Sequence, residues 1–299
     1  MTSFKHSSFA GMVLAATAFA LLTSVDTIFK LIAVGHPAYQ ILFLNACFAL
    51  PPIYGWALMT GGIERLRTVR LGQHLARGST SVMSAFAAIY AYSRLPLTDF
   101  YAIVFAGPLL VTALSAFWLG EKVDISRWLA ILVGFGGIMV VAYPTDMEAV
   151  TQGAFATAGR LSALLSVFCY SLSVVIVRRM RLGETNITFS FYGYVACFLI
   201  SGVLLVLHGA PKLQMMEMTH LALSGLLAGT ASICLMTAYH RTPVALVAPF
   251  QYTQIIWGAV AGYLLWAHVP DMRLVVGALI VAASGLFVIY REFREKEVV

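Results

Sequence analysis

Long apolar stretches follow one another along almost the whole chain, and this feature constrains the fold most. A bilayer core about 30 Å thick needs about 20 apolar residues per helical crossing. Ten such stretches are separated by short polar breaks, at 9–33, 38–59, 74–93, 98–119, 127–144, 156–178, 187–208, 220–240, 244–267 and 272–290. A β-barrel would need alternating apolar and polar residues. The pattern therefore predicts an all-α membrane protein with ten transmembrane helices.

Composition agrees with a chain whose main solvent is lipid. Of its 299 residues, 60% are hydrophobic and 11% are charged, whereas soluble domains carry about 25% charged residues. The four cysteines fall within apolar stretches without CxxC spacing, and the sequence has no HExxH array and no Walker A motif. We therefore predict no metal, no cofactor and no ATP hydrolysis, and we do not expect a membrane enzyme.

Basic residues predict the orientation, because Lys and Arg near span ends tend to stay in the cytoplasm. With the N-terminus inside, the outer ends carry only five of the 19 basic residues: Lys30, Arg94, Arg160, Lys212 and Arg273. The other 14 (19 − 5) lie at inner ends. Both termini are therefore predicted to be cytoplasmic. This bias also accounts for the net charge of +6, so a nucleic-acid partner is not expected.

A repeated pattern appears when residues 91–143 are laid over 238–290 with a shift of 147. Ala-Tyr-Ser-Arg-Leu-Pro then meets Ala-Tyr-His-Arg-Thr-Pro, and Asp124 falls on Asp271. A shift of 148 aligns the front of each half and places Lys30 on Arg178. We predict a first five-helix repeat at 1–144, a polar linker at 145–152 and a second repeat at 153–299.

Five crossings per repeat have a mechanical consequence. After five crossings the chain is on the opposite side of the membrane, so the second repeat is inserted upside down relative to the first. Inverted repeats with a binding site near mid-bilayer recur among secondary transporters, where they support one state open to each side. The alternative is that duplication only enlarged a stable helical bundle.

Several motifs resemble those of the EamA-type drug/metabolite transporter superfamily. They are Leu-Pro-Leu-Thr-Asp-Phe-Tyr-Ala-Ile at 95–103, Trp-Leu-Gly-Glu-Lys at 118–122 and Val-Ala-Pro-Phe-Gln-Tyr at 247–252. Asp-Thr-Ile-Phe-Lys at 26–30 is similar to a bacterial subgroup with riboflavin and S-adenosylmethionine carriers. The resemblance implies ten helices in two inverted repeats, metabolite transport and a bacterial inner membrane. One departure is His268 at the position that corresponds to Glu121, which implies gates of unequal chemistry.

Charged residues inside the spans are the first candidates for a site, because a charge in a membrane costs several kcal/mol unless it is paired or wetted. Asp26 and Lys30 lie one helical turn apart and can form an ion pair facing the bundle. Alternatively, Lys30 reaches the membrane interface and Asp26 bonds a neighbouring helix. Asp99 begins the fourth span, where helix capping is the simpler role. Asp26, Lys30, Asp99 and Glu121 form the predicted coupling or gating set.

The ninth span adds Gln251, Gln254 and Gly258, whose spacing places them on one helical face. Amides there either join helices or contact a substrate, and aromatic side chains, among them Tyr90 and Tyr92 near the end of the third span, can complete the cavity. For any single aromatic, packing or an interfacial position is the alternative role. The predicted substrate-binding residues are Gln251, Gln254, Tyr252, Trp257, Tyr101, Phe105, Tyr90, Asp26 and Tyr170.

Together these features predict a secondary transporter that carries a vitamin, a nucleoside-like or an amino-acid-like metabolite by alternating access. An amino-acid or drug exporter of the same fold is the second interpretation. A channel, a receptor or a structural protein are alternatives of another class. The expected partners are the solute, the lipid bilayer and coupling protons, with the chain as a monomer or homodimer. Substrate and direction stay open.

Overall fold

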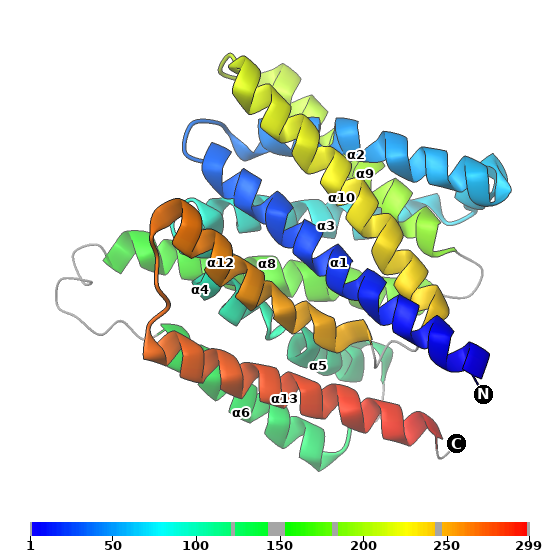
Figure 1. The fold of residues 1–299 in the computed structure, drawn as a ribbon, viewed down its shortest axis with the longest axis vertical. Helices are drawn as coiled ribbons and strands as arrows, with labels where there is room; N and C mark the ends of the chain where they lie inside the picture. Colours follow the sequence, from blue (N-terminus) through cyan, green and yellow to red (C-terminus); the bar gives the residue numbers. More distant parts are fainter. Residues whose placement is uncertain (1, 121–122, 143–152, 181–184, 243–246, 298–299) are drawn as a thin grey trace.

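The computed structural model describes residues 2–120, 123–142, 153–180, 185–242 and 247–297, which form packed helices without a strand (Figure 1). The first half contains α1 (Thr2–Ile32), α2 (Ala38–Gly61), the 3₁₀ helix η1 (Ile63–Leu66), α3 (Leu71–Tyr92), α4 (Leu97–Val104), α5 (Gly107–Leu119) and α6 (Ile125–Ala142). The second half contains α8 (Gly153–Met180), α9 (Asn186–His208), α10 (Met215–Arg241), the 3₁₀ helix η2 (Ala248–Thr253), α12 (Gln254–Trp266) and α13 (Met272–Glu297).

Seven segments of the described chain are long and apolar enough to cross a membrane. They are Phe9–Ile32, Ala38–Gly61, Leu97–Leu119, Phe155–Met180, Ile187–His208, Met215–Arg241 and Met272–Arg291. The helix α6 adds a shorter apolar run, Ile125–Val140. An all-helical membrane chain is therefore confirmed. The count of ten crossings stays a prediction, and the predicted linker at 145–152 lies outside the described residues.

Helix packing follows the sequence repeat. The helix α1 packs along α10, and α8, which corresponds to α1, packs along α3, which corresponds to α10. The corresponding helices α2 and α9 pack against each other, as do α6 and α13. Figure 1 shows α6 and α13 side by side at one edge of the bundle, away from α2, α9 and α10. Such an exchange of partners is what a twofold relation between the halves would produce.

The fourth predicted helix of each repeat changes its winding at the same place without ending. The helix α5 begins at Gly107 after α4 ends at Val104, and α12 begins at Gln254, directly after η2 and 147 positions after Gly107. The backbone stays helical through both junctions. Pro108 lies in the first turn of α5 and Pro249 in the first turn of η2. Proline is tolerated there because a first-turn N–H has no partner within the helix.

Glycines allow α10 and α2 to approach closely. A Cβ atom added at Gly225 would lie 2.5 Å from Phe48 Cβ, and one at Gly229 would lie 2.6 Å from the Ala49 carbonyl oxygen. Gly225 and Gly229 therefore let the backbones of α10 and α2 come into contact, as their Gly-xxx-Gly spacing predicts.

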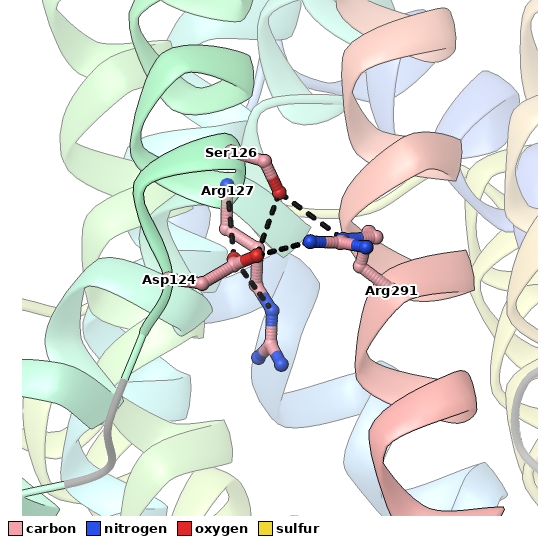
Figure 2. A network of polar contacts seen from close by, with 4 residues as sticks. All are labelled: Asp124, Ser126, Arg127 and Arg291. Carbon is pink, nitrogen blue, oxygen red and sulfur yellow. Dashed lines mark hydrogen bonds and ion pairs between the residues drawn. The ribbon is translucent and has the colours of Figure 1, made fainter.

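A polar network joins α6 to α13 at the end of the bundle where both chain termini lie (Figures 1 and 2). Asp124 accepts hydrogen bonds from the Arg127 backbone N–H at 3.2 Å and from Ser126 Oγ at 2.8 Å. Arg291 of α13 donates to Asp124 and, through Nε, to Ser126 Oγ at 3.1 Å. The bonds from Ser126 and Arg291 hold the pKa of Asp124 below its ordinary value of 3.8.

Asp271 provides a matched control for this network, because it corresponds to Asp124 and caps α13 through the Leu274 N–H at 2.7 Å. The residue that corresponds to Arg291 is Pro144. We expect Asp124→Asn to lower the free energy of unfolding by up to about 1 kcal/mol more than Asp271→Asn, because the partly exposed ion pair is lost only in the former.

The pH dependence of this contribution has a defined sign. Asp124 has a lowered pKa in the folded state, so its stabilisation is full at neutral pH and disappears as the pH falls through that pKa. Unfolding in one detergent at several pH values measures this. Asp124 also pairs with Arg127, whose Nε lies 3.5 Å from Oδ1. Equal losses for Asp124→Asn and Asp271→Asn at neutral pH would therefore show that neither arginine pair contributes to stability.

Candidate functional site

A carboxylate surrounded by hydroxyl groups lies where several helices meet. Tyr101 Oη of α4 donates to Asp26 Oδ2 of α1 at 2.8 Å, and Tyr92 of α3 hydrogen-bonds the same carboxylate. Tyr101 and Tyr92 are 1% and 3% exposed, and Asp26 is partly buried. Hydrogen bonds to a charged acceptor offset part of the cost of removing that charge from water. Asp26 is thus held by tyrosines from two other helices.

The second half of the chain contributes the next layer. Gly258 of α12 faces the ring of Tyr101, and a Cβ atom added there would lie 2.6 Å from the ring. Tyr194 of α9 lies within electrostatic range of Asp26 and hydrogen-bonds Ser232 of α10. The carboxylate therefore lies at a meeting point of both repeats, which is where an inverted-repeat transporter places its substrate.

Lys30 does not pair with Asp26. Its Nζ donates to the backbone carbonyls of Tyr92 at 2.8 Å and Leu95 at 2.5 Å, and it lies 5.3 Å from the centroid of the Trp266 ring. A cation at the last carbonyls of a helix is favourable. The ion pair suggested by the four-residue spacing is therefore absent. Asp26 bonds neighbouring helices, and Lys30 is bonded within the protein rather than extended to the interface.

Asp99 lies in the first turn of α4 rather than at its cap. The helix begins at Leu97, after Pro96, and no side chain caps it. The Thr98 hydroxyl contacts Asp99 Oδ1 at 3.4 Å. The carboxylate still interacts with the positive end of the helix, but the capping bond that we expected does not form. Glu121, the fourth predicted gating residue, lies outside the described residues.

The two glutamines belong to two successive helical segments, η2 and α12. Gln254 is 7% exposed and begins the buried face of α12, which continues through Gly258 and Gly262. Gln251 lies in η2, where residues three apart stack above each other. Trp257 is 44% exposed and lies away from that buried face. The structure therefore places Trp257 on a different side of α12 from Gln254, with which we expected it to line the substrate site.

Two aromatic residues that correspond in the repeats touch each other. The ring centroids of Phe105 and Tyr252 lie 4.7 Å apart, with the rings at 77°. Phe105 is 1% exposed. Tyr252 Oη is buried, has no hydrogen-bond partner in the described part of the chain, and faces Gly285 of α13. A buried hydroxyl without a partner is unfavourable, so this atom is a candidate to bond a solute.

Tyr252→Phe is therefore expected to leave the free energy of unfolding within about 0.5 kcal/mol of the wild type or to raise it, since no hydrogen bond is lost. Tyr101→Phe is the matched control, and we expect it to cost about 1.5–3 kcal/mol because it removes a bond to a carboxylate. Thermal unfolding without added solute measures both. Similar losses in the two variants would show that Tyr252 Oη has a partner.

Tyr90 and Tyr170 lie apart from Asp26. Tyr90 is 44% exposed. The guanidinium carbon of Arg94 lies over its ring, 3.4 Å from the ring centroid. Tyr170 is 47% exposed and within electrostatic range of Arg77 on α3. Of the predicted aromatic residues, the structure thus keeps Tyr101, Phe105 and Tyr252 near the repeat contact.

Two residues of this centre were not among the candidates from the sequence, and a third was named there only as a neighbour of Tyr90. That third residue, Tyr92, lies two positions after Tyr90, so the two side chains point to different sides of α3 and the structure places Tyr92 on the buried side. Tyr194 and Ser232 carry no distinguishing motif, because their role depends on how α9 and α10 pack beside α1.

Comparison with known proteins supports transport. The chain is 28% identical to a riboflavin transporter of Vibrio cholerae, with 96% of this chain and 95% of that protein covered. It is 23% identical to an S-adenosylmethionine uptake transporter of Rickettsia bellii, covering 89% of each chain. It is also 25% identical to a pseudopaline exporter of Pseudomonas aeruginosa, covering 92% of this chain and 94% of the exporter.

A solved crystal structure of a protein that is 17% identical shares the fold, with a TM-score of 0.59 and coverage of 95% of this chain and 96% of that one. The model of the EamA-like transporter family matches residues 9–143 and residues 157–291, one match in each half. The two matches cover nearly all of the helical chain, and the protein therefore belongs to the EamA-like transporter family.

Proposed function

We propose that this chain is a secondary transporter that moves a small organic metabolite across a bacterial inner membrane by alternating access. The observation that carries the proposal is the partly buried carboxylate of Asp26, bonded by Tyr101 and Tyr92 where both halves meet. A carboxylate inside a membrane protein is costly and marks a substrate or proton pathway by default. The excess of basic residues at one side supports cytoplasmic termini.

The proposed cycle uses the contact between the repeats. The solute binds beside Asp26, Tyr101 and the buried face of α12 that begins at Gln254. The halves then rock about their contact, and the changes of helical winding before Gly107 and Gln254 supply places where the helix can bend. The touching rings of Phe105 and Tyr252 lie on this contact, so their separation or repacking would accompany the change of state.

The substrate that this site supports best is a planar heterocycle with hydrogen-bond donors. Aromatic rings offer stacking surface, the Gln254 amide and the Tyr252 hydroxyl offer hydrogen bonds, and Asp26 accepts donors or a cation. Riboflavin and S-adenosylmethionine, which are the solutes in the names of two relatives, both combine a fused ring system with polar groups. Asp26 also offers a site for a coupling proton.

Counterflow in proteoliposomes tests the proposal. Vesicles containing the purified chain are loaded with unlabelled riboflavin, S-adenosylmethionine, a nucleoside or an aromatic amino acid, and entry of the labelled solute is followed. A carrier gives saturable entry that is accelerated by solute inside, whereas protein-free vesicles give neither. Entry that rises in proportion to concentration without saturation would identify a channel and overturn alternating access.

A further inference from the structure

A cavity of about 270 Å³ lies at the C-terminal end of α1, between the two halves of the chain. Three basic side chains line it: Lys30 and Arg94 from the first half and His268 from the second. The start of α4 and Trp266 complete the wall. Among the described residues that line the cavity there is no aspartate or glutamate. By the count of basic residues, this is the outer mouth of the bundle.

Neutral groups hold two of these cations in place. The Lys30 ammonium bonds two backbone carbonyls and lies beside Trp266. The Arg94 guanidinium lies over the rings of Tyr90, at 3.4 Å, and Phe155, at 4.6 Å. Carbonyls and aromatic rings orient a cation, but they carry no net charge to cancel it. Both cations are thus fixed at the cavity wall without being neutralised by these contacts.

The carboxylate of Asp99 beside the cavity is shared among several basic side chains. Asp99 interacts electrostatically with Lys30, and also with His268 and Arg160. Asp271 is a further acidic neighbour of Asp99. Two carboxylates therefore face three permanently basic side chains, Lys30, Arg94 and Arg160, so the mouth keeps an excess of positive charge.

The two mouths of the bundle differ in which positions of the repeat are acidic. By the repeat, Lys30 corresponds to Arg178, Arg94 to Arg241 and Gly262 to Ser115. The correspondence holds in space, because Arg178 Nη1 lies 3.5 Å from Ser115 Oγ, as Lys30 and Gly262 share the outer cavity. The sequence of the inner mouth has Glu121 where the outer mouth has His268. By the same shift Asp99 corresponds to Leu246, so the two mouths carry their acidic residues at different positions of the repeat, and the outer mouth has none at position 268.

We propose that the outer cavity binds an anionic oxygen group, a carboxylate or a phosphate, carried by a free solute or by a lipid headgroup. Lys30 and Arg94 supply charge-assisted donors, and the first-turn N–H groups of α4 have no partner within the helix and favour an anion. Trp266 adds an aromatic face for a ring that bears the carboxylate. Binding here is an equilibrium property, so it stands or fails independently of the proposed transport.

Calorimetric titration of the full chain in phosphatidylcholine nanodiscs tests the site, with benzoate and inorganic phosphate as separate probes. We expect saturable binding of at least one probe. His268→Glu gives the outer mouth the acidic residue of the inner one, and the added negative charge repels an anion. We expect it to weaken that binding by about tenfold or more, because a hydrogen bond to a charged group contributes about 1.5–3 kcal/mol and 1.4 kcal/mol corresponds to tenfold in affinity. Lys30→Gln should weaken binding similarly. Lys212→Gln removes an exposed outer charge away from the cavity and should leave affinity unchanged.

A second lipid separates the two sources of the anion. The titration is repeated in nanodiscs with and without phosphatidylglycerol, both at high salt so that the charge of the lipid surface is screened. The affinity is then the same in both lipids if the occupant is a free solute. Competition by phosphatidylglycerol supports the same site with a lipid headgroup as its occupant. His268→Glu does not remove the bonds of Lys30 to α3, so thermal unfolding of this variant shows whether its fold is intact. Absence of saturable binding in both lipids, or equal affinity in wild type and folded His268→Glu, overturns the proposal.

Discussion

Replacing Asp26 with asparagine is expected to reduce net solute uptake in proteoliposomes by about tenfold or more while the protein still folds. Asparagine keeps the size of the side chain and an oxygen acceptor for Tyr101, but it carries no charge. Hydrogen bonds to charged groups contribute about 1.5–3 kcal/mol, and 1.4 kcal/mol corresponds to tenfold in affinity. Loss of one such interaction with the solute therefore accounts for the expected change.

Two further variants separate binding from folding. Asp26→Ala removes the acceptor for Tyr101 and Tyr92, and each buried hydroxyl left without a partner costs about 1–3 kcal/mol, so this variant should unfold more easily than Asp26→Asn. Asp271→Asn, which alters a carboxylate outside the proposed site, controls for loss of any acidic residue and should retain uptake. Uptake of Asp26→Asn at the wild-type rate would remove Asp26 from both the substrate and the proton pathway.

Exchange measurements divide the two roles that Asp26 can have. If Asp26 carries a coupling proton, Asp26→Asn should lose net uptake but keep solute-for-solute exchange, because exchange needs no release of the proton. If Asp26 bonds the solute itself, both activities should fall together. The comparison uses the same vesicles with and without unlabelled solute inside.

A second large effect is expected at Gly258, where alanine should lower the free energy of unfolding by about 1–3 kcal/mol. The added Cβ would lie 2.6 Å from the Tyr101 ring. That ring is 1% exposed and its hydroxyl is bonded to Asp26. The ring therefore cannot move aside without breaking the bond, and α12 must shift instead. Uptake should fall with stability, because the shift alters the contact between the repeats.

Gly262 is the matched control, one helical turn further along α12. A Cβ atom there would have no neighbour within 4 Å, so Gly262→Ala should be neutral or raise the free energy of unfolding by up to about 1 kcal/mol through helix propensity. Thermal unfolding of both variants in one detergent gives the comparison. Equal stability would show that α12 does not pack on Tyr101 as described.

A double-mutant cycle assigns the mechanism of the Gly258 effect. If the clash acts through the ring that is tied to Asp26, Tyr101→Phe frees the ring to move, and the cost of Gly258→Ala should be smaller in that background. Additive effects would mean that the added methyl group acts on another neighbour. The unfolding free energies of the two single variants and the double variant decide between these outcomes.

The sequence by itself determined the membrane class and the helical secondary structure, and it predicted two repeats, each of which the family model matches separately. Continuous apolar stretches leave a helix as the way to satisfy backbone hydrogen bonds in lipid. The apolar pattern predicted continuous spans at 98–119 and 244–267, so the starts of α5 at Gly107 and of α12 at Gln254 came from the structure. These two starts correspond under the shift of 147, because related local sequences form related local structure.

Only the tertiary structure decided which side chains meet. The spacing of Asp26 and Lys30 allowed an ion pair, yet Asp26 bonds Tyr101, 75 residues away, and Lys30 bonds carbonyls at the end of α3. Trp257 follows Gln254 by three residues, yet it is 44% exposed whereas Gln254 is 7% exposed. The spacing of residues along a helix shows which side chains share a face of that helix. Partners on other helices depend on how the helices pack. That packing joins residues far apart in the chain, and no local sequence pattern indicates it.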